Sequence, residues 1–193
     1  MKPIAISVLT VCGVEELPEH ATRKVTHVLS LLDPGWPEIA AFGTFDDHHR
    51  RVMHFHDIID PAEGKIMPTP EDVAAILAFG EELAASREAR EDGHLLVHCH
   101  MGVSRSTAAM LSLLAQVHAE EPEEQLFERL REIRPRAWPN SVMVGFADEQ
   151  LGRGGRLVEA LKWHYGWQLK RDPRFHDWMG QLGRHREVDM AVA

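Results

Sequence analysis

Cys99 and Arg105 lie six residues apart in the stretch "VHCHMGVSRST", residues 97–107, between two apolar runs. A strand, a loop and then a helix direct backbone N–H groups and a helix N-terminus to one point, where an anion is stabilised. The same field favours a thiolate, the nucleophilic form of cysteine. The guanidinium of Arg105 could bind two oxygens of a tetrahedral oxyanion. These residues predict a phosphate cradle with Cys99 at its floor.

Two further loop residues fit this chemistry. Gly102 permits backbone conformations that other residues resist, and it lets the backbone approach a ligand closely. Ser106 could donate a hydroxyl hydrogen bond to the sulfur of Cys99. The alternative is that Cys99 is a buried core cysteine at a strand end, but the spacing to Arg105 favours a site. The predicted substrate-binding residues are His100, Met101, Gly102, Val103, Ser104 and Arg105.

The elements that position this loop follow from hydrophobic patterning. We expect strands over 4–11, 24–32, 50–58 and 94–99, because near-continuous apolar runs are typical of parallel strands covered on both faces. Thr69 and Pro70 begin a helix that extends towards residue 90, since Thr is a common N-cap and Pro is favoured at the first helical position. Further helices follow the loop. The prediction is an α/β fold, with a mostly parallel sheet of about four or five strands flanked by helices and an α-helical C-terminal part.

Composition limits the classes of function. The chain has 193 residues and a formal net charge of −9, which argues against binding to nucleic acid or to anionic membranes. No stretch approaches the roughly 20 apolar residues that span a bilayer. The apolar start faintly resembles a signal peptide but lacks a small-residue cleavage site. With only Cys12 and Cys99, a reducing, cytoplasmic location is expected.

A family resemblance adds to this interpretation. "HCHMGVSRS" resembles the H-C-x5-R-[S/T] signature of the protein tyrosine phosphatase superfamily, and "GVSRS" is similar to its dual-specificity branch. "KVTHVLSLL", "HFHDI" and "RPRAWPNSVMVGFADEQLG" are similar to segments before and after that signature. The resemblance covers roughly residues 4–165. It implies a phosphatase domain over 1–165, with a tail over 166–193 that packs on the same domain or at an oligomer contact.

The resembled mechanism implies hydrolysis of phosphate monoesters through a phosphocysteine, without metal or cofactor. The implied substrate is a phosphorylated protein carrying phosphotyrosine, with phosphoserine and phosphothreonine also open, or another phosphate monoester. A carboxylic acid must protonate the departing oxygen. Asp57 lies at the end of the predicted strand, where the family's aspartate would fall, and Asp60 is the second candidate. Asp60 precedes Pro61 and could simply form a turn.

Other chemistry remains open from sequence. Thirteen histidines include the pair in "HFH", which could share a metal, but no second cluster has convincing ligand spacing. Arsenate reductases and sulfurtransferases also use a cysteine in an anion-binding loop, and Cys12 could then be a resolving thiol. A non-catalytic phosphoprotein-binding module usually lacks the cysteine or the arginine, and this chain has both.

Two segments fall outside the resemblance. "LGRGGRL", residues 151–157, is basic and glycine-rich, which suggests either a second phosphate site or a turn between helices, and we favour the turn. The tail contains "WHYGWQLKRDPRFHDWMG", with three of the five tryptophans. It could pack on the core, form an oligomer contact or wall the active site. The oligomeric state is not predicted.

Overall fold

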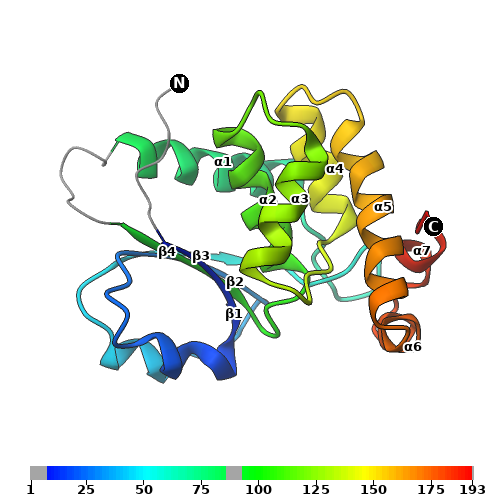
Figure 1. Ribbon diagram of the computed structural model, residues 1–193. Helices are drawn as coiled ribbons and strands as arrows, with labels where there is room; N and C mark the ends of the chain where they lie inside the picture. Colours follow the sequence, from blue (N-terminus) through cyan, green and yellow to red (C-terminus); the bar gives the residue numbers. More distant parts are fainter. Residues whose placement is uncertain (1–7, 86–92, 193) are drawn as a thin grey trace.

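The computed structural model describes residues 8–85 and 93–192. Its described strands form one parallel sheet in the order β1-β4-β2-β3 (Figure 1). They are β1 (Val8–Gly13), β2 (His27–Leu32), β3 (His49–His54) and β4 (His94–Cys99). All six residues of β4 are buried, as expected for a central strand covered on both faces. The predicted α/β fold with a parallel sheet is confirmed, with four strands in the described part of the chain.

Helices cover one face of the sheet and 3-10 turns cover the other (Figure 1). The helical layer contains α1 (Pro70–Ala85), α2 (Arg105–Val117), α3 (Glu123–Ile133), α4 (Ser141–Gln150) and α5 (Arg156–Arg171). The opposite face carries η1 (Val14–His20) and η2 (Ala40–Thr44). The larger hydrophobic cluster lies beneath the helices and includes Val97 and Leu111. A smaller cluster, with Cys12, Val28 and Leu96, lies beneath the 3-10 turns. The two clusters fix the sheet from both sides.

Element boundaries differ modestly from the predictions. The third strand ends at His54 rather than at residue 58, because the chain leaves β2 after Phe55. The amide of Phe55 donates to Leu32 O, and that of His56 donates to Ile66 O in the following loop. The segment that contains Asp57 therefore lies in the loop that follows the sheet strand. The predicted helix beginning at Pro70 is described to Ala85, and residues 86–92 lie outside the described part, as do residues 4–7 of the first predicted strand.

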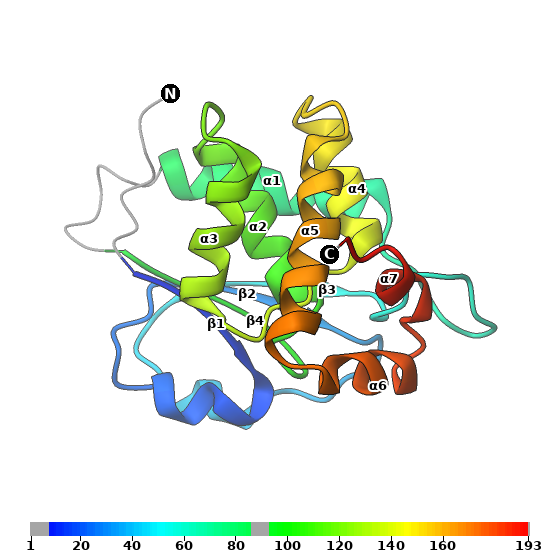
Figure 2. The ribbon, with the colours of Figure 1, turned by 45° about the vertical axis from the view of Figure 1, so that its right-hand side comes forward.

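The C-terminal segment forms α6 (Arg174–Gln181) and α7 (His185–Asp189), which lie beside α5 (Figure 2). Residue 165, where the sequence places the end of the phosphatase domain, lies within α5. Tyr165 stacks on Trp138 with ring centroids 4.3 Å apart. Phe175 and Met179 of α6 belong to the larger hydrophobic cluster. These contacts pack the C-terminal segment on the same core as the sheet.

The "LGRGGRL" segment is a helix-to-helix turn. The carboxylate of Asp148 accepts hydrogen bonds from the amides of Gly155, Leu157 and Val158, over 2.5, 2.6 and 3.2 Å. These are the amides at the N-terminus of α5 that a phosphate would need. The buried Asp148 thus already occupies that position, in agreement with the turn interpretation.

Candidate active site

The loop between β4 and α2 contains most of the predicted site residues. Cys99 is the last residue of β4 and Arg105 is the first residue of α2, so residues 100–104 form the whole connection. Gly102 has φ +67°, the left-handed conformation. A Cβ at this position would lie 2.4 Å from the carbonyl carbon of Cys12. The loop closes tightly over β1 only because Gly102 has no side chain.

The backbone carbonyls of this loop have hydrogen-bond donors, whereas its amides have no backbone acceptors among the described residues. The carbonyl groups of its five residues all accept hydrogen bonds from outside the loop. His100 O accepts from Val14 N (2.9 Å), Met101 O from Arg134 and Arg136 (both 3.1 Å), Gly102 O from Arg134 Nε (2.9 Å), Val103 O from Trp138 N (2.8 Å) and Ser104 O from Asn140 N (3.4 Å). Within the described part of the chain, the amides of 100–104 donate to no backbone acceptor. Since buried amides need partners, this side of the loop is suited to an oxyanion.

The nucleophile candidate sits at the floor of the loop. Cys99 Sγ lies 3.1 Å from Ser106 Oγ, and both residues are buried. The hydroxyl can donate to a thiolate at this distance. The predicted contact between these two side chains is present.

Cys12 lies on the other side of the sheet. It belongs to the cluster under the 3-10 turns, whereas Cys99 belongs to the cluster under the helices. Burial, with the nearby charge of Glu16, raises the pKa of the Cys12 thiol to about 12. A protonated thiol on the opposite face is poorly suited to resolve an intermediate on Cys99. This placement disfavours the reductase alternative.

The guanidinium of Arg105 has protein partners at Nη1 and, among the described residues, none at Nε. Its Nη1 donates to Asp33 Oδ1 over 2.7 Å and to Phe55 O over 2.5 Å. The side chain is almost fully buried, yet its Nε has no hydrogen-bond partner among the described residues. A buried guanidinium N–H without a partner is costly. The free Nε edge fits the bidentate recognition of a tetrahedral oxyanion.

Asp57 is the carboxylate that reaches the loop. Its Oδ1 accepts from Ser104 Oγ over 2.8 Å, from Asn140 Nδ2 over 3.1 Å and from Arg184. Burial alone would raise the pKa of Asp57, but the charges of Arg184 and Arg105 and these hydrogen bonds outweigh it and lower the pKa. Ser104, predicted to bind substrate, therefore contacts Asp57 through its hydroxyl.

Asp60, the second acid candidate, lies apart from the loop. Its Oδ1 lies 3.1 Å from Arg186 Nε, and its side chain is 61% exposed. It does not line the cavity at Cys99. The geometry favours Asp57.

The histidines of "HFH" and His98 have hydrogen-bond partners within the fold. His98 Nε2 lies 2.6 Å from Ser30 Oγ, and burial, reinforced by Arg50, lowers the pKa of His98 to about 3. In the "HFH" pair, His56 Nδ1 accepts from the amide of Ile66, and His54 Nδ1 lies 3.4 Å from Asp33 O. Among the described residues, no group of three His, Cys, Asp or Glu side chains is placed to hold a metal ion.

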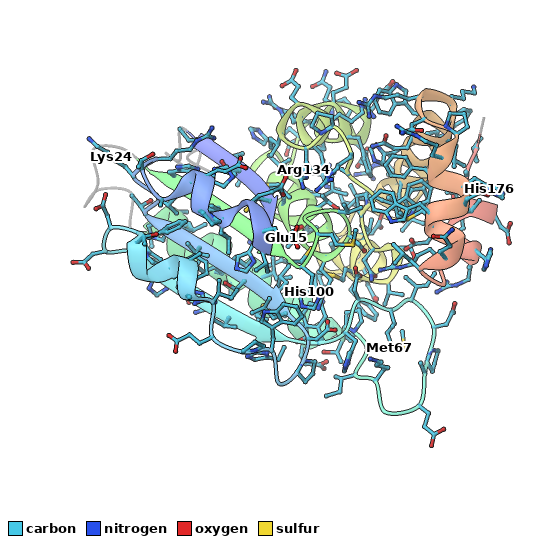
Figure 3. The ribbon with its side chains drawn as sticks, turned by 90° about the horizontal axis from the view of Figure 1, so that it is seen from below. Glu15, Lys24, Met67, His100, Arg134 and His176 are labelled. Atoms are coloured by element: carbon cyan, nitrogen blue, oxygen red, sulfur yellow. The ribbon has the colours of Figure 1, made fainter. Side chains whose placement is uncertain are left out.

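A cavity of about 250 Å³ opens above Cys99. Five of the six predicted substrate-binding residues line it, and the sixth, Gly102, does not but packs against the backbone of Cys12 and Gly13. His100 stacks on Trp36 at 3.8 Å and lies between the strands and the C-terminal helices (Figure 3). The remaining lining residues are Asp33, His56, Asp57, Ile58, Lys65, Met179, Leu182 and Arg184. Met179 and Leu182 of the C-terminal segment therefore line the same cavity as the loop residues.

Four residues at the site were not predicted. Asp33 and Arg184 contact the predicted residues directly, Asn140 joins Asp57 to α4, and Arg134 holds the loop carbonyls. Asp33 could have been found, because it follows β2 directly and the carboxyl ends of parallel strands share one edge. Asn140 and Arg134 lie in the quoted "RPRAWPN" segment. Nothing local marks Arg184.

Comparisons with known proteins agree with this geometry. The family described as "Protein-tyrosine phosphatase" matches residues 36–143. Human Protein phosphatase Slingshot homolog 3 is 31% identical over 159 residues, which are 80% of this chain and 20% of that protein. The chain thus spans about a fifth of the length of this relative. Human DUSP28 matches with a TM-score of 0.54 and 17% identity, over 75% of this chain and 92% of the other. Cydia pomonella PTP-2 phosphatase matches with a TM-score of 0.56 and 20% identity, over 76% and 88%. The chain belongs to the protein-tyrosine phosphatase family, and its fold is like that of a dual-specificity phosphatase.

Proposed function

We propose that this chain hydrolyses phosphate monoesters of proteins through a phosphocysteine on Cys99, with phosphotyrosine as substrate and phosphoserine or phosphothreonine as further substrates. The observation that carries the proposal is the polarity of the loop. All five of its carbonyls are bonded outward, and the buried Nε of Arg105 has no hydrogen-bond partner in the part of the chain that the structure describes. A phosphoryl group satisfies both sets of donors.

The chemistry follows from the contacts. The thiolate of Cys99 attacks phosphorus, the bond to the leaving oxygen breaks, and Asp57 gives that oxygen its proton. The loop amides and Arg105 hold the three equatorial oxygens. A water molecule then attacks the phosphocysteine, its proton passes to the Asp57 carboxylate, and the P–S bond breaks to release phosphate. Ser106, 3.1 Å from the sulfur, donates to the departing thiolate.

The surroundings support a phosphoprotein as partner. Ile58, Met101, Met179 and Leu182 supply apolar surface around the cavity, which suits the ring of a phosphotyrosine. Lys65 and His100 supply polar groups on the same wall. The net charge of −9 disfavours nucleic acid as a partner. Among the described residues, no helix is both long and apolar enough to cross a membrane.

We propose residues 1–165 as the catalytic unit, with 166–193 packed on it as a wall of the site. A cytoplasmic location is also proposed, supported by the two free cysteines, which suit a reducing compartment.

The test compares the wild-type protein with Cys99→Ser. Release of phosphate from phosphotyrosyl, phosphoseryl and phosphothreonyl peptides is measured, together with binding of the same peptides. We expect hydrolysis by the wild type alone and retained binding by Cys99→Ser. Equal binding with no hydrolysis by either folded protein would instead support a non-catalytic binding module.

A further inference from the structure

We propose that Arg184, on the C-terminal segment beyond the matched family region, is a positioning residue for Asp57 as general acid. This inference rests on the proposed phosphatase activity. The Arg184 side chain is only 3% exposed, and it contacts residues 55–69 between β3 and α1, which we call the acid loop. Its Nη2 donates to Asp57 Oδ1, to Asp57 O over 3.1 Å and to Ser104 Oγ over 2.9 Å. One guanidinium nitrogen thus joins the acid to the phosphate-binding loop.

Arg184 is itself held by the body of the domain. Its Nη1 donates to Glu187 Oε1 over 3.2 Å, and Glu187 is fully buried. The same carboxylate accepts from the Ser141 amide over 2.7 Å and from Trp138 Nε1 over 2.8 Å. Trp138 lies two residues before Asn140 and Ser141 directly follows it, and Asn140 also binds Asp57. The guanidinium therefore occupies a fixed place relative to α4 and to the loop.

The described hydrogen bonds to the Asp57 carboxylate all reach one of its two oxygens. Asp57 Oδ1 accepts from Ser104, Asn140 and Arg184, while no described side chain or amide donates to Oδ2. The residue lines the cavity above Cys99, and its side chain is 30% exposed. An acid fixed through one oxygen can carry a proton on the other and present it to a leaving group. Fixed orientation of this kind is a large part of acid catalysis.

The charges around Asp57 determine how Arg184 affects its titration. The titratable groups around the acid come from several elements. They are Cys99 of β4, His100 of the loop, Arg105 of α2, Asp33 after β2, His56 and Lys65 of the acid loop, Tyr165 of α5, and Arg184 and Glu187 of the tail. Burial favours the protonated acid, and Arg184 is the strongest of the influences that lower the pKa of Asp57, followed by Arg105. Without Arg184, burial still raises the pKa of Asp57, and one of the two cations that lower this pKa is lost. The pKa of Asp57 then rises.

The tests use the full chain with Arg184→Met, Arg184→Lys and, as matched control, Arg186→Met. Arg186 is on the same segment and contacts the same acid loop, but through Ile59 O and Asp60. The variant Arg184→Met with Glu187→Gln avoids leaving a buried anion unpaired if the single variant does not fold. For each protein kcat/KM is measured against pH with phenyl phosphate, whose leaving group needs a proton, and with 2,4-dinitrophenyl phosphate, whose leaving group does not.

We expect Arg184→Met to lower kcat/KM for phenyl phosphate at least tenfold and for the dinitrophenyl ester much less. The alkaline limb of the profile should move up by about one pH unit, because the lost cation no longer favours the carboxylate. Arg184→Lys should keep the limb near its original pH with a partial loss of rate. Arg186→Met should leave the limb in place.

Two results would overturn the inference while the proposed function stands. One is an equal loss for both substrates with an unmoved alkaline limb, which indicates a structural role alone. The other is a gain in activity at every pH, which would make the contact an autoinhibitory one. A folded wild-type protein that is inactive on both esters would contradict the proposed function itself, and the inference with it.

Discussion

Arg105 Nη1 and Asp33 Oδ1 lie 2.7 Å apart, at the edge of the sheet where β2 and β4 end side by side. The pair aligns the guanidinium so that Nη1 faces Asp33, while Nε has no partner within residues 8–85 and 93–192. A nearly fully buried cation is thereby oriented before any ligand arrives. The relationship matters because recognition of an oxyanion depends on the direction of the N–H bonds as well as on charge.

Replacement of Asp33 by Ala should weaken phosphate recognition. Without the Asp33 carboxylate, the guanidinium of Arg105 loses its orientation. Part of the free energy of phosphate binding is then needed to order this side chain. We expect kcat/KM for a phosphotyrosyl peptide to fall about tenfold, or about 1.4 kcal/mol, with a parallel rise in the inhibition constant of vanadate. Asp47→Ala, at an exposed position, is the control. Tighter vanadate binding by Asp33→Ala would show that Asp33 competes with phosphate instead.

Asn140 has two roles that two substitutions separate. Its Oδ1 accepts from the amides of Val142 and Met143 as the N-cap of α4, while its Nδ2 donates to Asp57. Asn140→Ser keeps a good cap and loses the donor, whereas Asn140→Ala loses both. We expect only Asn140→Ala to lower the free energy of unfolding, by about 1 kcal/mol, as measured in urea.

Turnover should fall to a similar extent in both Asn140 variants, because both lose the contact to the acid. Phosphate release from a phosphotyrosyl peptide provides the measurement. If Asn140→Ser kept full activity, the Nδ2 contact would be irrelevant to the position of Asp57.

Gly102→Ala should disrupt the loop. The added Cβ would meet the Cys12 carbonyl carbon at 2.4 Å, and φ is +67°. Neither the β1 backbone nor the loop can yield without moving the amides, so we expect kcat/KM to fall by more than 100-fold, about 2.7 kcal/mol. Gly145→Ala, with open space around its Cβ position inside α4, is the matched control. It should be neutral or raise stability by up to about 1 kcal/mol. Near-normal activity of Gly102→Ala would contradict the rigid loop.

Stability should fall on acidification through buried neutral histidines. Burial lowers the pKa of His164 to about 4, against an ordinary value of 6.5. Below pH 6.5 His164 binds a proton in the unfolded chain but not in the folded chain. Its protonation therefore does not affect the free energy of unfolding above pH 6.5 and lowers it progressively towards pH 4. This group alone contributes a slope of about 1.4 kcal/mol per pH unit.

His164→Gln should remove that slope, because Gln does not titrate. The Gln amide can still donate to Ala137 O, which lies 2.9 Å from His164 Nε2 in the wild type. Urea unfolding at pH 7 and pH 5 measures the difference, with the exposed His176→Gln as control. His98 gives the wild type a second contribution of the same sign. Identical slopes in His164→Gln and wild type would show that His164 titrates normally.

The cradle could be predicted because it is local. Cys99, Gly102, Arg105 and Ser106 lie within eight residues, so a strand end and a helix start are enough to bring them together. Asp57 could be predicted because a strand end precedes it. The parallel sheet followed from near-continuous apolar strands, which need cover on both faces. Each of these inferences depends on periodicity or on short spacing.

The rest of the site depends on contacts between distant parts of the chain. Asp33 meets Arg105 across 72 residues, and Arg184 meets Asp57 across 127 residues. The strand end before Asp33 is a local signal, but it does not name Arg105 as the partner. Arg184 does not differ in sequence from a solvated surface charge. Glu187 illustrates the same limit. It looks like an exposed helical glutamate but is fully buried against Trp138 and Ser141.

The order of synthesis gives the contact between Arg184 and Asp57 a further consequence. On the ribosome, Asp57 and the loop at 99–105 emerge long before residue 184, since chains are made from the N-terminus. A nascent chain could therefore close its sheet and its oxyanion loop while the acid still lacks its arginine. The last of these side chains to be translated then completes the set, so catalytic competence would be acquired late, after most of the core has already formed.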